Sequence, residues 1–199
     1  MSIRKQLVRI LQESKIKPIR QSIYNDSVRK AFNDFVNLSK DEDYSVIGGI
    51  ALGKYTLPRN TMDIDVIVKD DANADKLVDA VKSKFKKNRS HAIEHKATGV
   101  EIEILTPEFL KIDKTIIDDA IDTSEIDHDA KVVSLQYLLA LKLNRAANSN
   151  DKKAYQDKYD ILSLIENYGE IDLSNLDLSK KEIKLYKDLI AQSKMKDMI

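Results

Sequence analysis

The sequence predicts an α+β fold, in which helices cover one face of a small mixed β-sheet and further helices flank that core. Apolar residues recur at helical spacing before residue 40 and again after residue 131. Between these stretches the period changes to the alternation typical of strands. We therefore expect an N-terminal helical segment at residues 1–40, a sheet-containing core at 41–130 and a C-terminal helical region at 131–199.

The composition excludes several functional classes. Lys plus Arg and Asp plus Glu both total 33, so the chain has no net charge to favour sequence-independent binding to nucleic acid. The absence of cysteine excludes disulfides, zinc–thiolate sites and thiol nucleophiles. No apolar run is long enough to span a bilayer, and the first residues do not resemble a signal peptide. We therefore expect a cytoplasmic protein with no membrane partner.

The elements are predicted from apolar spacing and from the few glycines and prolines. Two helices are expected first, at about Ser2–Ser14 and Ser22–Leu38, separated by Pro18. The core elements are then expected as a strand at Tyr44–Ile47, a short helix after Gly48-Gly49, a strand at Met62–Lys69, a helix at Asn73–Lys87, and strands at Ser90–His95 and Val100–Leu105. Three helices follow, from about Lys131, at Tyr155–Asn167, and at Lys180–Lys194 with Ser179 as N-cap.

Two acidic residues alternate with apolar ones on the strand expected at Met62–Lys69. Successive strand side chains point to opposite faces, so Asp63 and Asp65 share one face of the sheet. Two carboxylates this close repel each other and raise each other's pKa. A bound cation removes that cost, and hard oxygen ligands suit Mg²⁺.

The strand expected at Val100–Leu105 repeats this alternation with Glu101 and Glu103. If it pairs beside the first strand, a third carboxylate joins the same site. Either pattern alone is equally typical of a half-solvated antiparallel strand. The three histidines (His91, His95 and His128) have no metal-binding spacing, and we expect them at the surface or in loops.

The Gly48-Gly49 pair follows a strand and opens a helix. Glycine allows the backbone to approach a ligand closely, and a helix N-terminus favours phosphate. A tight strand-to-helix turn would explain the pair equally well. The order of Gly-Gly turn, Asp-x-Asp strand and later acidic strand is more specific than any one part, because consecutive elements then supply a phosphate cradle and metal ligands.

This order resembles the DNA polymerase β-type nucleotidyltransferase superfamily. Within it, the stretch VIGGIALGKYTLPRNTMDIDVIV is similar to enzymes of the AbiEii/AbiGii abortive-infection toxin type. Those enzymes commonly carry an Arg-x-Thr-x-Asp-h-Asp segment, to which Arg59 and Thr61 correspond here. Their third carboxylate often precedes h-Leu-Thr-Pro, a pattern that selects Glu103 over Glu101.

The resemblance continues into the C-terminal region. The segment SLQYLLALKLNRAA is similar to the family's Leu-x-x-Leu-Lys segment, which makes Lys142 a candidate phosphate contact. The residues DKYDI are similar to the end of the family's Lys-Asp-x-x-Asp-h pattern, with Gln156 where a basic residue is usual. Asp157 and Asp160, together with Glu101, are therefore candidates for contacting the substrate or supporting the site.

The resemblance implies Mg²⁺-dependent transfer of a nucleoside monophosphate from an NTP such as ATP, with release of pyrophosphate. It implies two Mg²⁺ ions, with Mn²⁺ as an alternative, bound by Asp63, Asp65 and Glu103. The candidate nucleotide-binding residues are Gly48, Gly49, Lys54, Arg59, Thr61 and Lys142. Each of the basic residues taken alone is better explained as a solvated surface charge; Lys142 is the strongest candidate, because it interrupts an otherwise apolar helix.

The acceptor is left open by the sequence. The resemblance favours tRNA, and a small hydroxylated compound of the antibiotic type or a protein are alternatives. The basic run from Lys82 to Arg89 is a candidate RNA contact, although lysine-rich faces are usually solvated surface. A toxin neutralised by an antitoxin protein, and a nucleotide-binding regulatory module without catalysis, are further hypotheses.

Overall fold

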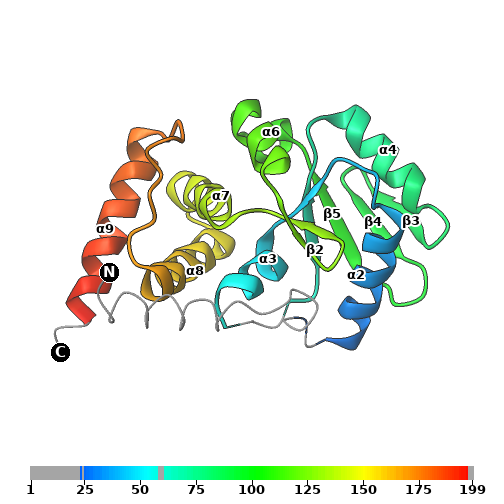
Figure 1. The fold of residues 1–199 in the computed structure, drawn as a ribbon, viewed down its shortest axis with the longest axis horizontal. Helices are drawn as coiled ribbons and strands as arrows, with labels where there is room; N and C mark the ends of the chain where they lie inside the picture. Colours follow the sequence, from blue (N-terminus) through cyan, green and yellow to red (C-terminus); the bar gives the residue numbers. More distant parts are fainter. Residues whose placement is uncertain (1–22, 24, 58–60, 197–199) are drawn as a thin grey trace, which may run out of the picture. The chain divides into compact units, whose positions relative to one another are not determined.

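The computed structural model describes residue 23 and residues 25–57 and 61–196. The helix expected at Ser2–Ser14 and the candidate residue Arg59 lie outside the described residues. The described part of the chain forms two compact units, one ending at Ser134 and the other beginning at Leu135 (Figure 1). Helix α2 and strand β7 both belong to the first unit, which therefore extends beyond residues 41–130 in both directions.

The first unit alternates helices with short strands, and the second is entirely helical in the described residues. In chain order the elements are α2 (Asp26–Leu38), β1 (Ser45–Val46), α3 (Gly48–Tyr55), β2 (Ile64–Ile67), α4 (Asp71–Val81), β3 (Phe85–Arg89), β4 (Ala92–His95), β5 (Glu101–Leu105), α5 (Pro107–Leu110), α6 (Lys114–Asp122), β6 (Glu125–Asp127), β7 (Ala130–Val132), α7 (Leu135–Asn148), α8 (Lys152–Tyr168) and α9 (Lys180–Lys196).

A seven-stranded mixed sheet is the centre of the first unit, with the strand order β3-β4-β5-β2-β1-β7-β6. Strands β2 and β5 are parallel, as are β1 and β7, and the other neighbours are antiparallel. The mixed sheet with its helices confirms the predicted α+β class. The parallel pairing of β2 with β5 also confirms that the two acidic strands are neighbours.

The alternation along β2 and β5 separates a buried face from a half-exposed one. Ile64 and Ile102 are fully buried, whereas Asp65 and Glu103 are half-buried on the opposite face. Helix α2 packs on the apolar face, where the ring of Phe35 lies 6.2 Å from that of Phe85. Helices therefore cover the apolar face and leave the carboxylates on the other.

The helix expected at Asn73–Lys87 is wrong in its last turn and a half, because α4 ends at Val81 and Phe85 begins β3. The Phe85 ring packs against Phe35 and, at 4.9 Å, against His95. Burial of this ring at the sheet edge overrides the local helical pattern. The expectation that all three histidines lie at the surface is also wrong for His95, which is buried and contacts Asp34 and Thr98.

The basic run from Lys82 to Arg89 is largely the edge strand β3 and the turn before it. Four of its five cations pair with carboxylates of the same unit. These pairs are Lys82–Asp79, Lys84–Asp34, Lys86–Glu94 and Arg89–Glu101. Charged side chains on an edge strand hinder pairing with other chains, which is a structural reason for the run.

The region between Leu105 and Leu135 contains four elements that the sequence pattern did not predict: α5, α6, β6 and β7. The helix expected from about Lys131 instead begins at Leu135, because Val132 pairs with Val46 of β1. In the helical unit, Ser179 and Glu182 form a reciprocal capping box, with contacts of 3.3 and 2.6 Å, which confirms the predicted N-cap of α9. No helix among the described residues is both long and apolar enough to cross a membrane.

Candidate active site

Three of the predicted carboxylates lie on one face of the sheet in the first unit. Asp65 of β2 is in register with Glu103 of the parallel strand β5. Asp63 immediately precedes β2 and lies near enough to Glu101 to oppose, in small part, the lowering of the Glu101 pKa that Arg89 causes. All these side chains are half-buried. The face thus concentrates negative charge where solvent and a bound ion can reach it.

Gly48 is required by the position of the Asp65 side chain. It has φ +66°, in the left-handed region, and an added Cβ would lie 2.0 Å from Asp65 Oδ2. The Ile47 amide donates to the Asp65 carbonyl at 2.9 Å, which fixes the turn against β2. The backbone entering α3 is therefore held directly beside a predicted metal ligand.

Helix α3 begins at this turn, with Ile47 in the N-cap position. Isoleucine has no side-chain acceptor with which to satisfy the first N–H groups of a helix. A phosphate group is a suitable partner for such groups, because a helix N-terminus carries partial positive charge. Gly48 and Gly49 are thus in a position consistent with the predicted phosphate contact.

Thr61, a predicted nucleotide-binding residue, forms hydrogen bonds with Asp63. Its hydroxyl donates to Asp63 Oδ1 at 3.0 Å and to the Asp63 carbonyl at 3.2 Å. The contact orients one carboxylate oxygen of Asp63. In this structure Thr61 positions an acidic residue of the site.

Arg89 is a site residue that the sequence analysis missed. It donates to Glu103 Oε1 at 3.0 Å and also pairs with Glu101, which accepts from Asn88 at 2.7 Å as well. A register shift between Lys87 and Arg89, typical of a β-bulge, brings Arg89 opposite Ala92. Ala92 in turn pairs with Glu103, so the bulge directs Arg89 toward the acidic face.

The hydrogen bond from Arg89 is the main reason that the pKa of Glu101 is lowered. Neighbouring Asn88 also lowers it, whereas burial and Asp63 act in the opposite direction. The same pairing raises the pKa of Arg89. Glu101 is therefore held ionised by Arg89, which makes it a supporting residue beside the predicted metal ligands.

The donor chemistry of this face fits a hard divalent cation, because it offers carboxylate oxygens from adjacent strands. Even so, no three His, Asp or Glu side chains among the described residues converge closely enough to hold an ion together. Glu103 is turned toward Arg89, which explains why it does not complete such a group with the aspartates. A third ligand from Glu103 would require Arg89 to release it.

Lys54 lies near the C-terminal end of α3 and is buried. Its ammonium group pairs with Glu125 of β6, a strand at the far edge of the same sheet. Tyr55 beside it donates to the Val133 carbonyl at 3.0 Å. These contacts give Lys54 a structural role in joining α3 to the end of the unit, apart from the turn at Gly48.

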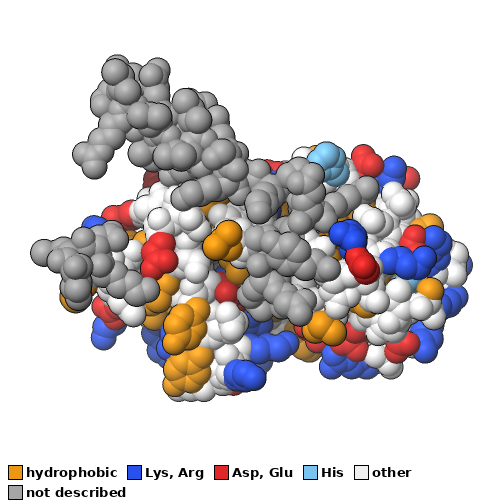
Figure 2. All heavy atoms as spheres, turned by 90° about the horizontal axis from the view of Figure 1, so that it is seen from below, with side chains coloured by type: hydrophobic (Ala, Val, Ile, Leu, Met, Phe, Trp, Pro, Cys, Tyr) orange, Lys and Arg blue, Asp and Glu red, His pale blue; other side chains and the backbone are white. Residues whose placement is uncertain are grey.

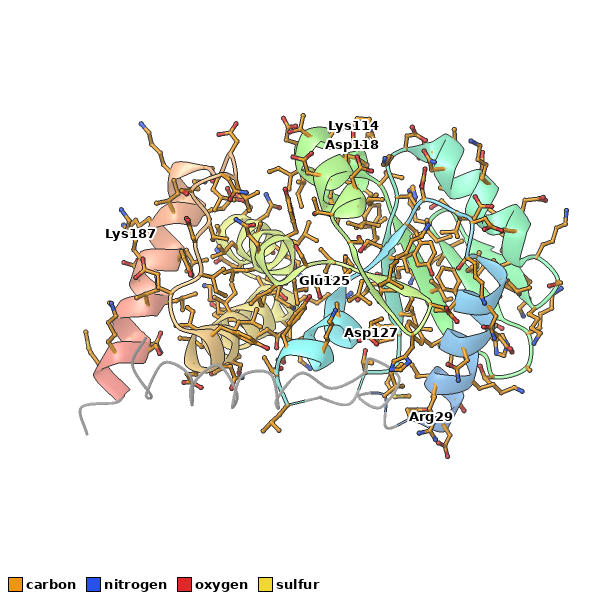
Figure 3. The ribbon with its side chains drawn as sticks, in the orientation of Figure 1. Arg29, Lys114, Asp118, Glu125, Asp127 and Lys187 are labelled. Atoms are coloured by element: carbon orange, nitrogen blue, oxygen red, sulfur yellow. The ribbon has the colours of Figure 1, made fainter. Side chains whose placement is uncertain are left out.

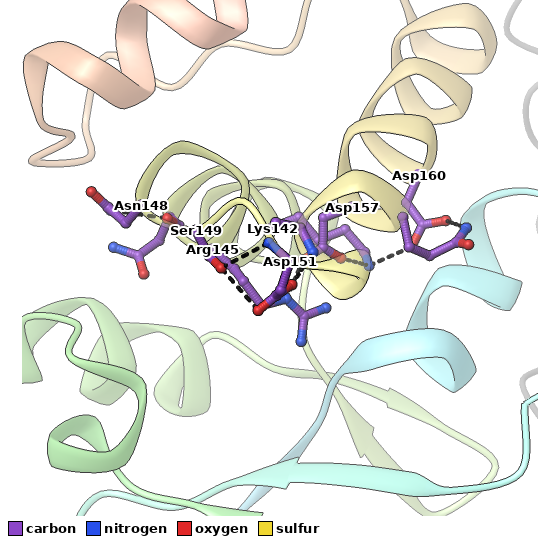
Figure 4. Close-up of polar contacts among 10 residues, drawn as sticks. Lys142, Arg145, Asn148, Ser149, Asp151, Asp157 and Asp160 are labelled. Atoms are coloured by element: carbon purple, nitrogen blue, oxygen red, sulfur yellow. Dashed lines mark hydrogen bonds and ion pairs between the residues drawn. The ribbon is translucent and has the colours of Figure 1, made fainter.

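Lys142, Asp157 and Asp160 form a buried ion cluster in the helical unit (Figure 4). The Lys142 ammonium lies 2.9 Å from Asp157 Oδ1 and 2.7 Å from Asp160 Oδ2. Arg145 pairs with the other oxygen of Asp157. Gln156 donates to Asp160 at 3.2 Å, so it supports the cluster from the position where the resembling family has a basic residue.

Comparison with known proteins finds similarity of fold among solved structures. No protein-family model and no curated protein sequence matches the chain. Among solved structures, the chain is similar to the Megavirus polyadenylate synthase, with a TM-score of 0.45 and 17% sequence identity. The match covers 98% of this chain and 43% of that one, so the chain spans less than half of the synthase's length. A function for this chain therefore has to be inferred from the residues of its own site.

Proposed function

We propose that the chain is a Mg²⁺-dependent nucleotidyltransferase, which moves a nucleoside monophosphate from an NTP to an acceptor hydroxyl. One observation carries the proposal. Asp65 is paired in register with Glu103 on a parallel strand, and the Gly48 turn approaches the Asp65 carboxylate so closely that no side chain fits. The carboxylates can bind metal ions, and the backbone amides of the adjacent turn can bind phosphate oxygens, so together they suit a metal-bound triphosphate.

The transfer forms one phosphorus–oxygen bond and breaks another. The acceptor oxygen attacks the α-phosphorus, the bond from that phosphorus to the bridging oxygen breaks, and pyrophosphate leaves. Mg²⁺ bound at the aspartates would stabilise charge on the phosphate oxygens and favour ionisation of the attacking hydroxyl. Asp63 and Asp65 are the residues that we assign to hold it, with Mn²⁺ as the alternative ion.

We assign Glu103 two roles: it accepts the proton of the attacking hydroxyl, and it is the third metal ligand. Its side chain is half-buried beside Asp65 and is held by Arg89 through a contact of 3.0 Å. When Arg89 releases Glu103, the carboxylate gains an oxygen able to accept a proton or contact an ion. The amides of Gly48 and Gly49 are assigned to the phosphates, and Thr61 orients Asp63.

The finer assignment, which follows from the AbiEii/AbiGii resemblance, is a toxin-type enzyme with tRNA as acceptor and an antitoxin protein as partner. A small-molecule or protein acceptor would use the same residues for the transfer. The acceptor therefore has to be identified by product analysis.

The test is a transfer assay with Mg²⁺, each of the four α-³²P-labelled NTPs in turn, and total tRNA. A variant with Asp63→Ala and Asp65→Ala should lose all transfer. A matched variant, Asp75→Ala and Asp79→Ala, removes two exposed aspartates from α4 and should transfer normally. Label in RNA would establish the tRNA acceptor, and label on the protein would establish protein modification. Equal activity in both variants would refute the site assignment.

A further inference from the structure

Two tyrosines project from α8 into solvent. Tyr155 is 55% exposed and Tyr159 is 68% exposed, although aromatic side chains usually bury most of their area. They are four residues apart, so they are neighbours on one face of the helix. Together they present two adjacent aromatic rings on the surface of the helical unit.

Lysines border these rings. Lys152 is exposed in the first turn of α8, three residues before Tyr155 and therefore on the same face of the helix. The Lys158 ammonium lies 5.0 Å from the centroid of the Tyr155 ring, within the range of a cation–π contact. We refer to Tyr155, Tyr159, Lys152 and Lys158 as the α8 platform.

The basic character of the α8 platform depends on the buried ion cluster. The segment from Asp151 to Asp160 contains three aspartates and three lysines and is neutral by sequence. Asp157 and Asp160 are buried, however, and their two negative charges are balanced within the unit by Lys142 and Arg145. Two of the three negative charges thus face inward, while Lys152 is exposed and Lys158 lies against the Tyr155 ring.

This separation of inward-facing aspartates from outward-facing lysines is confined to α8. On the face of the molecule shown in Figure 2, basic and acidic side chains are interspersed rather than separated by sign. The zero net charge of the chain agrees with that mixture. The α8 platform is distinguished by the combination of exposed aromatic rings with cations at their edges.

We propose that the α8 platform binds a single-stranded polynucleotide, with bases stacked on Tyr155 and Tyr159 and phosphates paired with the lysines. Surfaces that bind single strands combine aromatic rings with cations in this way. Lysine is depleted from the centre of protein–protein interfaces, which disfavours a protein occupant. Together with the proposed function, on which this step rests, the platform makes a polynucleotide the acceptor class.

The direct test measures binding without NTP or metal. The anisotropy of labelled oligo(rA) and oligo(dA) strands of about 12 nucleotides should rise on adding the full chain. Tyr155→Ala and Tyr159→Ala should each weaken binding by about 5- to 100-fold, whereas Tyr→Phe at either position should retain it because stacking needs only the ring. Thermal unfolding should show that each variant is folded.

Charge is tested separately with matched lysines. Lys152→Ala should reduce the slope of log affinity against log salt by about 0.7 if Lys152 neutralises one phosphate of the strand. Lys187→Ala is the control, because Lys187 is an exposed lysine of α9 in the same unit (Figure 3). It should leave both the slope and the affinity unchanged.

Three results would overturn the proposal: no binding by the unaltered chain, equal binding by the Tyr→Ala variants, or tyrosine variants that lose self-association instead, which would assign the surface to a second copy. The proposed function and the proposed α8 platform can be refuted independently of each other. Binding with no nucleotide transfer would refute the proposed function alone. Transfer to RNA that is insensitive to Tyr155→Ala and Tyr159→Ala would refute the platform alone.

Discussion

The two acidic clusters of this chain differ in burial and in the partners of their carboxylates. In the sheet unit, Glu103 is 21% exposed and Arg89 contacts it from the flexible end of a largely exposed side chain. In the helical unit, Asp157 is fully buried between Lys142 and Arg145. A buried carboxylate with two cations is already satisfied, whereas a half-exposed one can exchange its partner for an incoming ion. We therefore expect the first cluster to serve the proposed chemistry and the second to stabilise the fold.

Exchanging one carboxylate in each cluster should separate these roles most clearly. Asp65→Asn should lower nucleotidyl transfer by about a thousandfold or more, because several kcal/mol of transition-state stabilisation depends on the metal that Asp65 would hold. Asp157→Asn should instead lower the denaturation midpoint of the helical unit and leave the chemistry of transfer intact. Urea unfolding and single-turnover assays of both variants measure the two effects. A lowered midpoint with transfer retained in Asp65→Asn, together with lost transfer at unchanged midpoint in Asp157→Asn, would reverse the assignment.

Lys142→Met should destabilise the chain by about 3–5 kcal/mol, since it leaves two buried aspartates without their shared cation. Lys187→Met, at an exposed position of α9, should change stability by less than about 0.5 kcal/mol. Urea titrations followed by circular dichroism give both values. A stable Lys142→Met chain with weakened NTP binding would instead support Lys142 as the phosphate contact that the sequence resemblance implies.

Gly48→Ala tests the close approach in the sheet unit, and Gly99→Ala is its matched control. Both glycines have positive φ, +66° and +72°, so each substitution carries a similar backbone cost of about 1–2 kcal/mol. Only at Gly48 does the new Cβ collide with Asp65, because nothing lies within 4 Å of the corresponding position at Gly99. Transfer should fall sharply for Gly48→Ala alone. Equal activity of the two variants would disprove a role for the turn in placing Asp65.

The smallest effect is expected for Arg89→Gln, as a change in the pH dependence of unfolding. Arg89 lowers the folded-state pKa of Glu101 below its ordinary value of 4.5. The resulting stabilisation is present above that value and is lost as the pH falls through the lowered pKa. Arg89→Gln should therefore reduce the midpoint slightly at pH 7 and converge with the unaltered chain in strong acid. A difference that grew on acidification would contradict this pairing.

Part of the site is predictable from local pattern. The alternation of acidic and apolar residues fixes the face on which Asp63, Asp65 and Glu103 lie, because strand geometry has a period of two. The Gly-Gly turn is similarly visible as a break between a strand and a helix. These features are local in sequence, and the structure retains each of them.

Other features depend on contacts between distant residues. The bulge that directs Arg89 to Glu103 arises from pairing between β3 and β4, and the sequence shows only a basic run. The strands β6 and β7 are short and lie in an acidic stretch, so no apolar alternation marks them. The sequence indicates part of the pairing of Lys142 with Asp157 and Asp160. A single lysine interrupts an apolar helix, and two aspartates three residues apart share one face of the following helix.

The parallel pairing of β2 with β5 also determines when the active site can form during folding. Helix α4 and strands β3 and β4 intervene along the chain, so the entropic cost of closing this segment precedes any stabilisation by the pair. Helices α7 and α8 are joined by a short connection and have no comparable barrier. On dilution from denaturant, helical circular dichroism should consequently recover before transfer activity does.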